Sequence, residues 1–84
     1  MKPTLARLMR ATSAATTLAN EATEAALAGE PADPRVTAAR DRARVELRTA
    51  TVEAMAAGTP INVVAVLSKR VRDADQRATR ATGD

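Results

Sequence analysis

The sequence predicts a small all-α protein, in which an antiparallel, Ala-rich helical hairpin carries a third amphipathic helix. Three observations indicate this three-helix fold class. Two breaks containing Gly and Pro divide the chain, alanines recur at heptad spacing in the first two segments, and the third segment carries one apolar stripe. A chain of 84 residues makes one domain at most, so we expect a single helical domain over 1–84.

The two breaks set the predicted limits of the helices. At each break a Gly follows a helix end and a Pro opens the next helix, with a residue between them that can cap the new helix. The sets are Gly29, Asp33 and Pro34 at the first break, and Gly58, Thr59 and Pro60 at the second. We therefore predict helices at about 3–28, 34–57 and 60–80, followed by a frayed tail at 81–84.

Alanine dominates the contact predicted between the first two helices. It accounts for 21 of the 84 residues. The seam of the first helix consists of Ala15, Ala19, Ala22 and Ala26, and that of the second consists of Val36, Ala39, Ala43, Leu47, Ala50, Ala54 and Ala57. Small side chains let helix axes approach toward the short end of the usual range of about 8–10 Å. We expect the two seams to face each other within the hairpin, and dimerisation through them is the alternative.

The third helix is predicted from its apolar stripe. The stripe consists of Val63, Val64, Leu67, Val71, Ala74 and Ala78. The opening run 61–67 is rich in β-branched residues, so a strand is the alternative there. Thr59-Pro60 before the run and the amphipathic pattern after it favour a helix.

Several apolar side chains fall outside these contacts, and we predict that they meet a partner. In the second helix, Val45 and Val52 lie nearly opposite the Ala seam, where the third helix, another subunit or a foreign protein must cover them. In the third helix, Val66 falls off the stripe. The predicted partner or self-association residues are Val45, Val52, Ile61, Val63 and Val66.

Basic side chains follow two of the predicted helices. The net charge is +3. The second helix carries a ladder at intervals of four, with Glu46 and Glu53 on its other flank, and the third helix carries a basic face that is relieved by Asp73. The candidates are Arg40, Arg44, Arg48, Lys69, Arg70, Arg77 and Arg80. They are suited to phosphates or to the carboxylates of a partner. The alternative is a solvated face whose side-chain stems cover the core.

The composition argues against most kinds of catalytic, cofactor and metal site. The chain has no His, no Cys and no aromatic residue, and its three glycines stand far apart rather than in a phosphate-binding loop. A Ser or Thr nucleophile would lack the His that usually activates it. We therefore expect no catalytic residue, no cofactor and no metal site, and we predict that the protein is not an enzyme.

Residue usage also indicates an origin. Eleven of the thirteen basic residues are Arg, which together with the high Ala content is typical of GC-rich bacteria such as actinobacteria, or of their phages. We expect a cytoplasmic protein, or a virion-associated one if a phage encodes it. No stretch is long enough to cross a membrane. The first twenty residues share their basic, acid-free composition with mitochondrial presequences, but they continue into a helix that the fold requires.

These observations predict a non-catalytic helical protein–protein interaction or assembly module, which acts by self-association or by docking on a larger protein. The alternative is a small nucleic-acid-binding regulator that uses the basic face of the third helix. Residues 55–65 resemble the opening of a bacterial helix-turn-helix unit. Residues 66–71 then continue without the second turn that such a unit needs before its recognition helix, so this family is not assigned.

Overall fold

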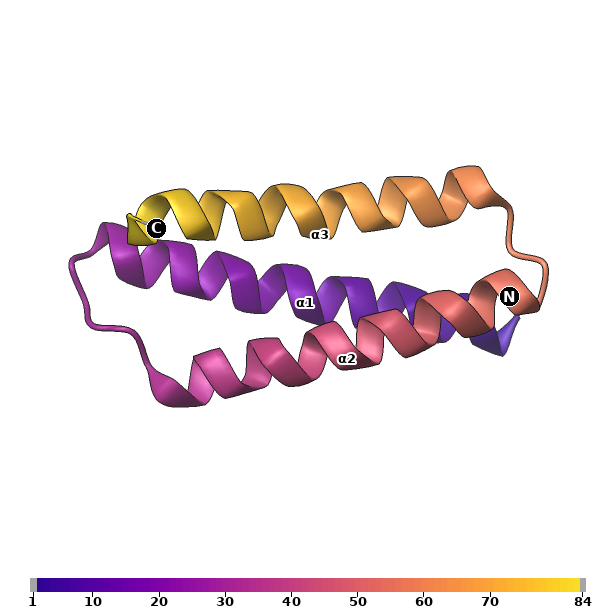
Figure 1. The fold of residues 1–84 in the computed structure, drawn as a ribbon, viewed down its shortest axis with the longest axis horizontal. Helices are drawn as coiled ribbons and strands as arrows, with labels where there is room; N and C mark the ends of the chain where they lie inside the picture. The colour runs from indigo at the N-terminus through magenta and orange to yellow at the C-terminus, as the bar shows by residue number, and fades with distance from the viewer. Residues whose placement is uncertain (1, 84) are drawn as a thin grey trace.

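Three helices make up most of the computed structural model, which describes residues 2–83. They are α1 (Pro3–Leu27), α2 (Pro34–Ala56) and α3 (Ile61–Thr82), as Figure 1 shows. No strand occurs within these described residues, and the run 61–67 is helical. The predicted all-α, three-helix fold class is therefore confirmed.

The two glycine breaks end α1 and α2 with the same backbone geometry. Gly29 and Gly58 adopt φ values of 74° and 88°, which favour glycine. After α2, the Gly58 N–H donates to the Met55 carbonyl at 3.1 Å, and the Thr59 N–H donates to the Ala54 carbonyl at 2.9 Å. This pair of bonds is a Schellman motif, which satisfies carbonyls that the end of the helix leaves without partners.

The helix starts differ from one another. Asp33 caps α2 as predicted, because its side chain accepts a hydrogen bond from the Arg35 N–H at 2.9 Å. The predicted cap at Thr59 is wrong. Pro60 occupies the N-cap position of α3 with no side-chain bond, and Thr59 is instead part of the Schellman motif that ends α2.

The end of α3 lies beyond its predicted limit at residue 80. The helix continues through Thr82, so the predicted fraying at 81–84 does not begin at Ala81. Gly83 then takes a left-handed φ of 81°, and its N–H donates to the Arg80 carbonyl, which gives the helix a regular end. The last residue of the predicted tail, Asp84, lies outside the described residues.

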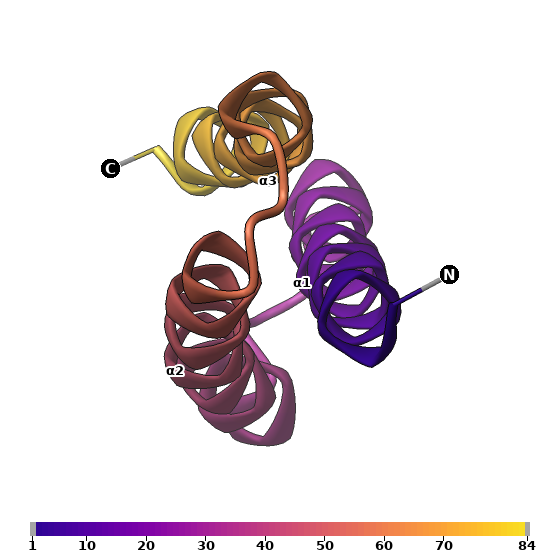
Figure 2. The ribbon, with the colours of Figure 1, turned by 90° about the vertical axis from the view of Figure 1, so that its right-hand side faces the viewer.

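The first helix is the one against which both of the others pack. α1 runs antiparallel to α2 and parallel to α3, and it packs against both of them, whereas α2 and α3 make few contacts with each other (Figures 1 and 2). The result is a rod of 43 × 22 × 19 Å with residue 2 near one end and residue 83 near the other. The third helix therefore packs on α1 and not across the second face of α2.

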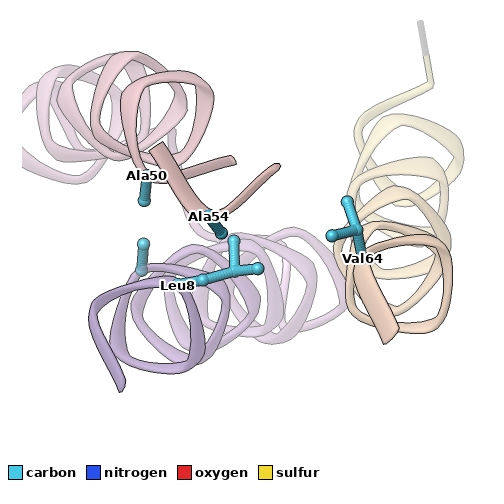
Figure 3. Packing of buried hydrophobic residues seen from close by; sticks show 5 residues of the cluster. Leu8, Ala50, Ala54 and Val64 are labelled. Atoms are coloured by element: carbon cyan, nitrogen blue, oxygen red, sulfur yellow. The ribbon is translucent and has the colours of Figure 1, made fainter. Parts of the chain in front are cut away.

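One large side chain lies at the centre of the core. Leu8 of α1 is fully buried and lies between Ala50 and Ala54 of α2 and Val64 of α3 (Figure 3). Ala11 completes this cluster, and Leu47 and Leu67 pack against it while partly buried. The buried apolar stripe predicted for the third helix is confirmed at Val64, Val71, Ala74 and Ala78.

The seam predicted on α2 is buried over part of its length, where it packs against Leu8 and Ala11 of α1. Ala50 and Ala54 are fully buried, but no residue of α2 before Ala50 is. Toward the connection at 28–33, α2 diverges from α1 (Figure 1). There Ala22 and Ala26 of the first seam line a hollow of about 300 Å³ instead of a closed contact. The connection carries Pro31 and is not helical, so it does not hold the two helix ends together as a tight turn would.

Candidate interaction surfaces

Four of the five predicted partner residues are exposed. The exposed fraction is 62% for both Val45 and Val52, 67% for Ile61 and 53% for Val66. Val63 is half-buried on the side of α3 that carries the apolar stripe. Because α3 packs on α1, the alternative that the third helix covers Val45 and Val52 is wrong. These apolar side chains are open to solvent on the molecule as it stands.

The exposed valines of α2 belong to a longer feature, which we call the outer α2 face. Its residues are Arg35, Ala38, Arg42, Val45, Thr49, Val52 and Ala56. They recur at alternating intervals of three and four, which places them in one row along a helix. All seven are exposed, and Figure 2 shows that α1 and α3 lie to one side of α2 and leave its far side free. This row has the spacing of a coiled-coil seam without a partner helix.

An acidic pair borders one flank of the outer α2 face. Arg7 of α1 donates from Nε to Glu46 at 2.8 Å and from Nη1 to Glu53, so one guanidinium holds two carboxylates. The hydrogen bond from Arg7 lowers the pKa of Glu46, and the bond to Glu46 raises the pKa of Arg7. The group retains one net negative charge at neutral pH. Helical periodicity alone places both glutamates on this flank, whereas their partner on α1 follows only from how the two helices pack.

The predicted arginine ladder of α2 divides into three different environments. Arg40 is only 19% exposed and contacts Asp75 of α3 at 3.1 Å, so it links two helices. Arg44 contacts Asp41 at 3.3 Å within α2. Arg48 is exposed and forms no ion pair with any residue that the structure describes. Only the end of the ladder near Arg48 is therefore wholly available to an external partner.

The predicted basic face of α3 is exposed. Arg70, Arg77 and Arg80 form no ion pair within residues 2–83, and Arg72, which was not predicted, is exposed as well. The fourth predicted residue contacts an acid: Lys69 Nζ lies 2.9 Å from a carboxylate oxygen of Asp73.

The carboxylate of Asp73 responds to its basic surroundings. The hydrogen bond from Lys69 lowers its pKa, and the charges of Arg72 and Arg77 act in the same direction. One acid is thus ionised among several cations, so this side of α3 keeps a clear positive excess. α3 also runs from Ile61 to Thr82 without the second turn of a helix-turn-helix unit.

A groove separates α2 from α3. It has a volume of about 470 Å³, and Leu47 and Val71 supply part of its lining, while Arg72, Asp75 and Arg80 lie along it. Sequence patterns did not reveal this groove, because it depends on how α2 tilts away from α3. The helix wheel shows which residues share a face but not the angle at which two faces meet.

No protein-family model, no curated protein and no solved structure matches this chain. Across the described residues, no cluster of three or more acidic, His or Cys side chains is placed to hold a metal ion. None of the three helices is long and apolar enough to span a membrane.

Proposed function

We propose that this protein is a non-catalytic helical interaction or assembly module, and that the outer α2 face is its principal docking surface. The observation that carries the proposal is the exposure of Val45 and Val52 in a row of heptad spacing. Such a row stabilises a helix pair only when a second helix covers it.

The distribution of side-chain size supports this assignment. The fully buried positions hold Leu8 and a set of alanines, whereas larger apolar side chains such as Val45, Val52 and Ile61 remain in solvent. Removing a Val or Ile side chain from water stabilises a complex by up to about 1.5–3 kcal/mol. Association would therefore bury more apolar area at these positions than it would if they were alanines.

Nucleic-acid binding is the second candidate, and the exposed basic face of α3 favours it. Phosphate contacts made by Arg70, Arg77 and Arg80 would be non-specific and would weaken steeply with salt. A gel-shift titration of duplex DNA and RNA at about 50 and 200 mM salt tests this candidate. The triple Arg→Gln variant at these positions should abolish any shift. No shift at the lower salt excludes the candidate.

The interaction function is tested by photo-crosslinking in the cells that encode the protein. A photoreactive phenylalanine analogue is placed in turn at Val45, Val52 and Val66, with exposed Asn20 of α1 as the matched polar control. We expect discrete crosslinked species from Val45 and Val52, and none of comparable yield from Asn20. Equal yields at all four positions, or no species at any, would overturn the proposed function.

A further inference from the structure

We propose that the occupant of the outer α2 face is a second copy of the same chain, with the two α2 helices antiparallel about a two-fold axis beside Arg44. This inference rests on the proposed function, since it names the partner of the same surface. It rests on the charges along and beside the outer α2 face, which are complementary to those of a second, antiparallel α2 helix.

Antiparallel pairing places opposite charges together on both flanks. In a two-fold antiparallel pair, each flank of α2 meets the same flank of the other copy. On one flank Asp41 then faces Arg48 of the second copy, and both side chains are exposed. Symmetry repeats this contact on the other side of the axis. Arg48 thereby gains an ion-pair partner, which it lacks among residues 2–83 of its own chain.

The other flank fits in the same register. Arg42 then lies against Glu46 of the second copy, and Arg35 lies against its Glu53. These glutamates are 51% and 44% exposed, and they share a single guanidinium from Arg7, so they retain a negative charge for a further cation. The stems of the two arginines also lie over the valines of the facing copy. The same antiparallel register thus brings together three opposite-charge pairs, and the two-fold axis repeats each of them.

A parallel pair is disfavoured by the same residues. With two α2 helices parallel and in register, Arg35 and Arg42 of the exposed row would each lie beside their own copies, and like charges in contact repel. Across the flanks, Asp41 would face Glu46 of the other copy, and this repulsion offsets the attraction of Arg48 for the facing Glu53. The like charges within the exposed row would therefore remain uncompensated. The charge pattern therefore selects the antiparallel arrangement.

The first test is solution mass together with site-specific crosslinking. Sedimentation equilibrium of the purified chain should show a monomer–dimer equilibrium whose dimer fraction rises with concentration. The chain contains no cysteine, so Val45→Cys introduces a single thiol close to the axis. A short bismaleimide should convert this variant to covalent dimer. The matched control, Val66→Cys on α3, should stay monomeric although its position is also exposed.

The second test reverses charges across the interface. Asp41→Arg places two cations together at two symmetric contacts, and it should weaken the dimer by about 2- to 30-fold. Arg48→Asp should weaken it in the same way, and the double variant should recover most of the affinity. Glu24→Arg, which makes the same change of net charge on α1, should leave the dimer unchanged and exclude a general charge effect.

The outcomes separate this inference from the proposed function. A chain that remains monomeric at every concentration, a dimer that crosslinks through Val66 instead of Val45, or failure of the double reversal to recover affinity overturns self-pairing of α2. In-cell crosslinks from Val45 to a different protein also overturn it while supporting the interaction function. Crosslinks from Val45 to a second copy support both.

Discussion

The Arg40 guanidinium of α2 lies 3.1 Å from the Asp75 carboxylate of α3, and this ion pair joins two helices that otherwise make few contacts. Arg40 is 19% exposed and Asp75 is 31% exposed, so this pair is more shielded than the other ion pairs within residues 2–83. The buried Nε atom of Arg40 has no hydrogen-bond partner among the described residues, which makes the bond from its Nη2 more important. This ion pair is therefore a polar link between the first half of α2 and α3.

Removing Asp75 should therefore loosen the start of α2. We expect Asp75→Ala to lower the free energy of unfolding by about 1–2 kcal/mol, because it leaves a partly buried guanidinium without its acceptor. Urea denaturation measures this change. Hydrogen exchange should also accelerate in 34–45. The control Asp73→Ala removes a more exposed contact within α3 and should cost less than about 0.5 kcal/mol. Equal losses from both variants would contradict a bridging role for Arg40.

Enlarging a fully buried alanine should destabilise the fold. Ala19 and Ala50 have no exposed surface, so Ala19→Leu or Ala50→Leu must push helices apart and should cost about 1–3 kcal/mol. Chemical denaturation measures the loss, and Ala14→Leu, at an exposed position of α1, provides the neutral control. If the variants at Ala19 and Ala50 unfold at the same denaturant concentration as the parent, these positions are not close contacts.

The left-handed turn after α2 requires glycine for conformational reasons alone. A Cβ added at Gly58 would meet no atom within 4 Å, but the φ of 88° disfavours any side chain. We expect Gly58→Ala to cost about 1–2 kcal/mol and Gly58→Asn to cost less, because Asn tolerates left-handed backbone better. Thermal melts of the two variants measure the difference. The reverse order, with Ala better tolerated than Asn, would contradict a purely backbone origin.

Acid should weaken an ion pair between α1 and α2 and another within α3. The folded state lowers the pKa of Glu46 through Arg7 and that of Asp73 through Lys69. A carboxylate whose pKa is lower in the folded state stabilises the fold fully above its unfolded pKa. This stabilisation is lost as the pH falls through the folded pKa. The melting temperature should therefore drop between about pH 5 and 2. Glu46→Gln should melt lower than the parent at neutral pH and should show a smaller drop in acid, and parallel curves would contradict this assignment.

The fold class followed from local signals, because each helix boundary depends on a few adjacent residues. Gly29 and Gly58 ended helices where predicted, and Asp33 capped the helix that follows it. Thr59 was misassigned because the same residue type suits a helix start and the residue after a glycine turn. Thr59 takes the second role because its N–H donates to the Ala54 carbonyl at the end of α2.

The exposed row on α2 was predicted in part. Helical periodicity alone places Val45 and Val52 opposite the Ala seam of α2, and both are exposed in the structure. Pairs within one helix, such as Asp41 with Arg44, follow the spacing rule for helical neighbours. The pairs between helices, Arg7 with Glu46 and Arg40 with Asp75, depend on how the helices cross, which no single helix encodes.

Because α1 and α3 run in the same direction, residues 2 and 83 lie near opposite ends of a rod 43 Å long. Any tag or domain fused at the two ends is consequently held far apart, and the helices act as a fixed spacer between them. A fluorophore pair attached at Lys2 and Gly83 would read out that spacing directly. Joining the same two positions by a short linker to permute the chain would require breaking the bundle.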